Sequence, residues 1–211
     1  MYVPSVIFLS TRSGLLTAMS DARDHGLRPF SVYQGRWSAA ERDFEREIIP
    51  MAREEGMALA PWGALGGGNF TVQDKAAAGE SGRNFRPQTE NQKRVSEKLS
   101  AVAKAKNTLI TSVALAYVMH KAPYVVPIVG GRKVDHLKGN IEALGLQLSE
   151  EEIDDIDSAI DFDVGFPMSF LFEFGGDKYN TRMTSANVGL LKFAGPLDSH
   201  PHQQPVKPHG L

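Results

Sequence analysis

The stretch that decides the fold is Val126–Ile141, which reads VPIVGGRKVDHLKGNI. A short apolar run, Val125–Val129, is followed at once by Gly130 and Gly131. From Val134 onward, apolar residues recur at helical spacing. The pattern therefore predicts a buried strand, a glycine turn and a helix in direct succession.

The same turn has the chemistry of an anion site. The first N–H groups of a helix are free, and its dipole is positive at that end. Gly130 and Gly131 would let the backbone approach a phosphate, and Arg132 and Lys133 would add two cations. The segment therefore indicates a phosphate site, and a surface turn with solvated charges is the competing interpretation.

Other elements follow from apolar patterns along the chain. Strands are predicted at Val6–Leu9, Phe30–Tyr33, Met57–Trp62 and Val125–Val129. Helices are predicted at Leu15–Ala22, Phe44–Ala52, Val95–Val102, Val113–Met119, Val134–Leu144 and Ser149–Ile160, the last with a capping box of Ser149 and Glu152. Strands that alternate with helices imply a parallel sheet. The pattern leaves open a small doubly wound sheet or half of a (β/α)8 barrel, which needs about 250 residues.

Composition narrows the function classes. The chain has 211 residues, a net charge of −2 and no cysteine. This balance gives no indication of a nucleic-acid partner, and disulfides and thiolate catalysis are excluded. No apolar run approaches the roughly 20 residues of a membrane helix, and Met1–Ser10 is interpreted as a strand rather than a signal peptide.

Two segments differ from the rest. Gly63–Thr89 is too long for an ordinary connection, so it is either a lid, with Lys75 or Arg83 on a phosphate, or a solvated loop. Residues 162–211 are predicted to form an irregular, partly disordered extension. Within it, His200, His202 and His209 could bind a metal, but Pro201 and Pro205 disrupt regular spacing, so a disordered tail is the preferred interpretation.

Several separated motifs, together with Val126–Ile141, carry a resemblance over roughly residues 5–170. They are Ala22–Leu27 (ARDHGL), Tyr33–Trp37 (YQGRW), Phe44–Ala52 (FEREIIPMA), Ala58–Gly68 (ALAPWGALGGG) and Phe162–Pro167 (FDVGFP). In this order they resemble the aldo-keto reductases, in particular the fungal branch of aryl-alcohol dehydrogenases and norsolorinic acid reductases. The resemblance implies an α/β fold of the partial (β/α)8 TIM-barrel type: the C-terminal half, about four β/α units, over residues 1–161.

The resemblance also implies an NADP(H) site at the C-terminal mouth of the barrel. Arg132 and Lys133 match positions near the adenosine 2′-phosphate, and His136 stands where many members have arginine. Asn140 matches the residue that holds the adenine. Gly139 departs from the family, because many members carry Glu or Gln there.

Further cofactor contacts are implied at other strand ends. Tyr33 matches the aromatic residue that stacks under the nicotinamide, and Ser10 lies near a ligand of its carboxamide. Trp62 and Gly66 belong to the loop that passes over the pyrophosphate. Gly130 and Gly131 would let the backbone approach the cofactor closely.

The family's catalytic Asp, Tyr, Lys and His lie on the first four barrel strands, which this chain is expected to lack; Tyr2 is no substitute. The expected function is an NADP(H)-dependent oxidoreductase acting on aryl aldehydes, ketones or alcohols in fungal secondary metabolism. A non-catalytic nucleotide-binding or interaction module is the alternative. The expected location is cytoplasmic, without membrane or nucleic-acid partners. Four strands cannot close a barrel, so a homo-oligomer or a missing N-terminal half is an expected partner.

Overall fold

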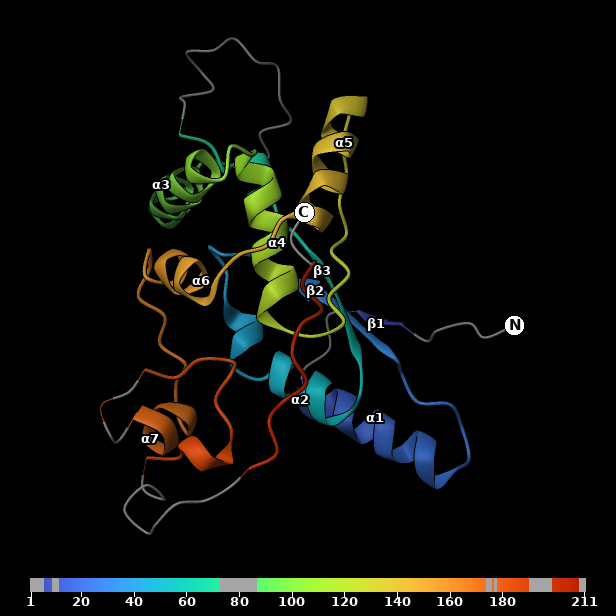
Figure 1. Ribbon diagram of the computed structural model, residues 1–211. Helices are drawn as coiled ribbons and strands as arrows, with labels where there is room; N and C mark the ends of the chain where they lie inside the picture. The colour runs from blue at the N-terminus through green and yellow to red at the C-terminus, as the bar shows by residue number, and fades with distance from the viewer. Residues whose placement is uncertain are drawn as a thin grey trace.

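A computed structural model describes residues 6–8, 12–72, 87–173, 176, 178–189 and 199–208. Over these ranges the chain forms a parallel sheet with helices packed on it, which confirms the α/β class (Figure 1). The strands are β1 (Val6–Phe8), β2 (Val32–Arg36) and β3 (Ala58–Trp62). The helices are α1 (Arg12–Asp24), α2 (Ile48–Glu54), α3 (Glu90–Ala105), α4 (Ile110–Lys121), α5 (Val134–Glu142), α6 (Glu150–Asp157) and α7 (Met168–Glu173). None of the described helices is long and apolar enough to cross a membrane.

The predicted fourth strand is present as an interrupted ladder. Val125 and Ile128 form parallel bridges with Leu59 and Trp62, so this segment lies next to β3. The Ile128 N–H donates to the carbonyl of Pro61 at 2.8 Å. Pro61 has no N–H to donate in return, which explains why the ladder is broken there.

The order of the strands bears on the two folds that the sequence left open. The sheet runs β1-β2-β3, all parallel, and segment 125–128 follows on the far side of β3. Strands that follow one another in the sequence are thus also adjacent in the sheet. This sequential order is typical of a β/α barrel rather than of a doubly wound sheet, whose order reverses. Closure into a barrel stays a prediction.

Several boundaries differ from the predictions, for physical reasons. β2 lies two residues later than Phe30–Tyr33, because its second half is polar and the apolar pattern missed it. The helix expected from Phe44 begins with a 3-10 turn, and α2 starts only at Ile48. Pro50 has no N–H and therefore fits only the first turn of α2.

The C-terminal region also departs from expectation. The helix expected to reach Ile160 ends at Asp157, although its capping box of Ser149 and Glu152 is confirmed. α7 was not predicted, and residues 199–208 contain no helix or strand. This segment contacts the body of the protein: Lys207 Nζ donates to the Leu148 carbonyl at 3.4 Å. The division at residue 161 stays a prediction.

Side chains alternate across the sheet, and this alternation positions the site. Tyr33 and Leu59 point toward the helices and are buried with α4, whose described side chains are almost all buried. Val32, Gln34 and Arg36 of β2, and Ala58, Ala60 and Trp62 of β3, point the other way and stay partly exposed. We call this second side the open face of the sheet.

Candidate functional site

Three strand ends form one row on the open face. The register pairs Arg36 with Trp62, and Trp62 with Ile128, across adjacent strands. The Arg36 guanidinium lies over the Trp62 ring, with 5.6 Å between its Cζ atom and the ring centroid, and it also forms an ion pair with Glu41. Because all three residues end parallel strands, the row lies at the C-terminal edge of the sheet. Ligands of parallel α/β sheets bind at this edge.

The indole N–H of Trp62 has an unusual environment. Its Nε1 atom is buried and has no hydrogen-bond partner among the described residues, while the ring is partly exposed. Indole nitrogen is a donor only, and a buried donor without a partner costs free energy unless water or a ligand satisfies it. Trp62 is thus a predicted site residue whose ring is partly exposed and whose buried indole N–H has no partner among the described residues.

The loop after β3 turns sharply at its glycines. Gly66 has φ 63°, and a Cβ atom there would lie 2.9 Å from the Phe70 ring. A side chain at residue 66 is therefore excluded by both backbone and space. Gln92 of α3 donates to the Gly66 carbonyl at 3.3 Å and holds the turn. Lys75 and Arg83 lie outside the described residues, so the predicted lid is described only at its ends.

The predicted glycine turn and the helix after it are confirmed, whereas the predicted buried strand is present only as the bridges of Val125 and Ile128, and Val126, Ile128 and Val129 are exposed. Gly130, Gly131, Arg132 and Lys133 are exposed, and α5 begins at Val134. Lys133 is the N-cap residue, and its side chain makes no hydrogen bond to the first N–H groups of α5. The segment follows the strand next to Trp62, which places two cations and a helix N-terminus at the C-terminal edge of the sheet.

The remaining residues predicted on this segment lie along α5. His136 is exposed, and a Cβ atom on Gly131 would lie 2.9 Å from the His136 Cβ, so the turn packs closely on the helix. Asn140 is half-buried. Gly139 is buried and its carbonyl accepts a hydrogen bond from Ser112 Oγ at 3.1 Å. The small residue at 139 therefore permits close packing of α5 on α4.

Tyr33 lies away from this edge. Its side chain is 4% exposed, and its ring meets Phe44 edge-on at 5.6 Å between centroids. Burial raises the pKa of the Tyr33 phenol. The stacking role predicted for Tyr33 finds no support in this position and stays a prediction. Ser10 lies outside the described residues.

The aromatic ring and the cation that do lie on the open face are Trp62 and Arg36. Arg36 was missed by the sequence analysis. The alternation of side chains along a strand could have identified it, because Arg36 ends a strand in which Val32 and Gln34 lie on the same face.

A second polar cluster lies inside the protein. Glu45 accepts hydrogen bonds from Arg42, at 2.7 Å and 3.0 Å, and pairs with Lys121 at 2.9 Å. Lys121 also donates to Asp157 at 2.6 Å, and the Tyr117 hydroxyl donates to Asp157. Burial opposes the charge on Glu45, but Lys121 and Arg42 outweigh it and lower its pKa. The cluster joins β2–α2 to α4 and α6.

This cluster contains a tyrosine, a lysine and an aspartate, but it is not arranged for proton transfer to a substrate. Tyr117 is fully buried, and burial, with the nearby Glu45 and Asp157 carboxylates, raises its pKa well above the usual 10. A tyrosine that serves as an acid near neutral pH needs the opposite shift. We therefore interpret the cluster as structural: it holds α4 and α6 against the β2–α2 connection.

Comparison with known proteins agrees with the resemblance. Residues 12–161 match the sequence model of the Aldo/keto reductase family. Norsolorinic acid reductase A of Aspergillus parasiticus is 58% identical over 187 residues, which cover 89% of this chain and 48% of that protein. An aryl-alcohol dehydrogenase of Pestalotiopsis microspora is 50% identical over 190 residues, with coverage of 89% and 48%. A putative aryl-alcohol dehydrogenase of Saccharomyces cerevisiae is 49% identical over 158 residues, with coverage of 71% and 55%. The chain spans about half the length of the curated relatives it matches.

Proposed function

Because the chain belongs to the aldo/keto reductase family, we propose that it supplies the cofactor-binding half of an NADP(H)-dependent oxidoreductase. Members of the family have a (β/α)8 barrel and generally use NAD(P)H. The names of the relatives, norsolorinic acid reductase and aryl-alcohol dehydrogenase, support an aromatic carbonyl compound or alcohol as substrate.

The observation that carries the proposal is the C-terminal edge of the sheet. A dinucleotide needs a flat surface for its rings, backbone groups or cations for its phosphates, and unobstructed approach. The edge offers the partly exposed Trp62 ring, the turn at Gly66, and the exposed turn with Arg132 and Lys133. These residues fit the chemistry of a dinucleotide.

The choice of NADP(H) over NAD(H) rests on the two cations. An adenosine 2′-phosphate adds about two negative charges, and a guanidinium can bind it through two parallel hydrogen bonds. Arg132 and Lys133 are exposed directly before α5, where the helix dipole adds to their charge. His136 follows on the first turn of the same helix.

Catalysis requires groups from outside the described residues. Hydride transfer to a carbonyl needs a proton donor, and Tyr117 is buried with a pKa shifted in the wrong direction. We propose that the donor comes from four further β/α units, which would complete the barrel. The length of the relatives that lies outside the match supports this source.

The surface that these units would cover is apolar. Val134, Leu137, Ile141 and Leu144 recur at helical spacing on α5 and its 3-10 extension, and each is more than half exposed. Figure 1 shows α5 standing next to α4 and projecting beyond the sheet. Val126 and Ile128 add exposed apolar side chains on the open face. Exposed apolar surface of this extent marks an interface, and parallel sheets are normally covered on both faces.

The experiment is complementation. The chain alone should bind NADPH without reducing an aryl aldehyde. Mixed with a fragment that carries the first half of a relative such as norsolorinic acid reductase A, it should oxidise NADPH when the aldehyde is present. Binding without turnover in the reconstituted complex would instead favour the non-catalytic nucleotide-binding module. Absence of NADPH binding in both samples would overturn the proposal.

A further inference from the structure

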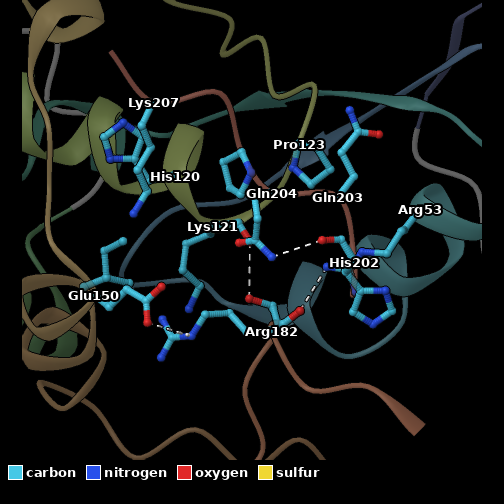
Figure 2. A pocket seen from close by; sticks show the side chains of 13 residues that line it. Arg53, His120, Lys121, Pro123, Glu150, Arg182, His202, Gln203, Gln204 and Lys207 are labelled. Carbon is cyan, nitrogen blue, oxygen red and sulfur yellow. Dashed lines mark hydrogen bonds and ion pairs between the residues drawn. The ribbon is translucent and has the colours of Figure 1, made fainter. Parts of the chain in front are cut away.

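A second site lies at the other end of the sheet. A small hollow, partly open to solvent, lies between the C-terminal end of α4, α6 and the segment 199–208 (Figure 2). His120, Lys121 and Pro123 line it just before strand segment 125–128 begins, and Arg53 lines it before β3 begins. It is therefore at the N-terminal ends of the strands, opposite the edge that holds Trp62 and Arg132.

The walls of the hollow are strongly basic. Two of their cations are neutralised: Lys121 by Glu45 and Asp157, and Arg182 by Asp154. Arg53 and Lys207 form no ion pair with any described residue. Figure 2 shows these two side chains on opposite sides of the hollow, with Gln204 between them. Among the described residues that line the hollow, Glu150 is the only one with a carboxylate, and it lies 4.0 Å from Arg182.

Arg53 has an unsatisfied donor at this place. Its Nη2 atom donates to the Thr181 carbonyl at 2.9 Å, but its Nε atom is buried without a hydrogen-bond partner among the described residues. Burial lowers the pKa of the Arg53 guanidinium, and the smaller opposing effects of Tyr179 and Glu54 do not offset it. Arg53 as a whole is only half-buried, and a guanidinium without a carboxylate partner is stabilised by an oxyanion, whose oxygens match its planar donors.

His120 adds a neutral donor. Its Nδ1 atom faces the Leu148 N–H at 3.4 Å and accepts from it, which assigns the ring proton to Nε2. Burial, assisted by the Lys207 charge, lowers the pKa of His120 to about 4, so the ring is neutral at pH 7. The wall thus offers two unpaired cations and a neutral imidazole around one space.

We propose that this hollow binds a phosphate group, either inorganic phosphate or a phosphate monoester, between Arg53 and Lys207. Two unpaired cations match the charge of a phosphate dianion. The site is separate from the proposed cofactor site, because the two lie at opposite ends of the same strands. The tail segment 199–208 supplies Lys207, so the bound phosphate also fixes this segment to α2 and α4.

The test is a phosphate titration of the full chain, followed by the midpoint of thermal unfolding at constant ionic strength. A ligand that binds only the folded state raises this midpoint. We expect phosphate to raise it relative to chloride, and Lys207→Gln to weaken the apparent affinity by about tenfold or more. Lys178→Gln removes one charge from an exposed site elsewhere and should titrate like the wild type. Arg53→Gln should behave as Lys207→Gln does.

Three outcomes would overturn the proposal. The first is a wild-type chain that is folded and shows no phosphate-dependent shift. The second is a Lys207→Gln variant that binds phosphate as the wild type does. The third is loss of the effect in Lys133→Gln but not in Lys207→Gln, which would place the phosphate at the cofactor edge and leave the proposed cofactor site intact.

Two further experiments show where the phosphate binds and whether the ligand is the free ion or a monoester. NMR titration of His120 should show its pKa rising when phosphate is added to the wild type, because the anion favours the imidazolium. The same titration should show no change in Lys207→Gln. Glycerol phosphate that binds as tightly as inorganic phosphate, or more tightly, indicates a monoester ligand, and weaker binding indicates the free ion. Acetate at equal ionic strength should have little effect.

Discussion

The Arg36 guanidinium lies over the Trp62 ring, 5.6 Å from its centroid, where two adjacent parallel strands end. The strand register brings these residues together, since Arg36 pairs with Trp62 in the β2–β3 ladder. Such a contact orients the ring and contributes about 0.5–1 kcal/mol at a partly exposed site. An aromatic surface and a cation are therefore in place at the edge before any ligand binds.

Replacing Trp62 tests whether this ring is a cofactor contact. Trp62→Ala should weaken NADPH binding about tenfold, because an aromatic stacking partner contributes about 1–3 kcal/mol. Trp62→Phe keeps a ring and should retain most of the affinity. Isothermal titration calorimetry measures both dissociation constants. Equal affinities for Trp62→Ala and the wild type would exclude the ring from the site.

The buried cluster predicts a large loss of stability from a small change. Glu45→Gln leaves Lys121 and Arg42 with one carboxylate, Asp157, in place of two, and should lower the free energy of unfolding by about 3–5 kcal/mol. Tyr117→Phe removes one hydrogen bond to Asp157 and should cost about 1–3 kcal/mol. Urea unfolding gives both values. A Glu45→Gln variant as stable as the wild type would contradict the structural role of the cluster.

His120 predicts how stability depends on pH. Its pKa falls from 6.5 to about 4 on folding, so the unfolded chain binds the proton more tightly. This group therefore leaves stability unchanged above pH 6.5 and lowers it as the pH falls from 6.5 toward 4, by about 2 kcal/mol at pH 5. His120→Gln should remove this part of the pH dependence in phosphate-free buffer. The lowered pKa of Glu45 acts only below about pH 4.5, outside most of this window.

The exposed side of α5 predicts where the other half of the barrel docks. Leu137→Glu with Ile141→Glu should abolish co-elution of the chain with a fragment carrying the first half of a relative, because two charges would be buried in an apolar contact. Leu27→Glu changes an equally exposed leucine beyond α1 and should leave the complex intact. Light scattering gives the composition of the complex. Co-elution of the double variant, or a stable dimer of the chain that excludes the fragment, would contradict this docking.

The sequence predicts local structure well where one residue type decides it. The glycine turn before α5, the capping box of Ser149 and Glu152, and the strand ending at Trp62 are all where their patterns indicate. The interruption opposite Pro61 was not foreseen. The missing N–H of Pro61 has a consequence only where a neighbouring strand would accept a hydrogen bond from it, and the sequence does not show which strand is the neighbour.

The two sites show what local patterns do not reveal. Nothing near Tyr33 in the sequence says which face of β2 it occupies, and the structure buries it against Phe44. The basic hollow depends on residues 199–208 folding back onto α2 and α4, so that Arg53 and Lys207 share one space. Proximity of this kind arises from tertiary packing, which a pattern of a few residues does not encode.

The measurement that tests the account most directly is the affinity of the chain for NADPH against NADH, in the wild type and in Lys133→Gln. The account predicts that NADPH binds about tenfold or more tightly than NADH, and that Lys133→Gln reduces this preference while leaving NADH binding unchanged. Equal affinity for the two cofactors, or a preference that survives the combined change of Arg132 and Lys133 to Gln, would contradict a 2′-phosphate site at the start of α5.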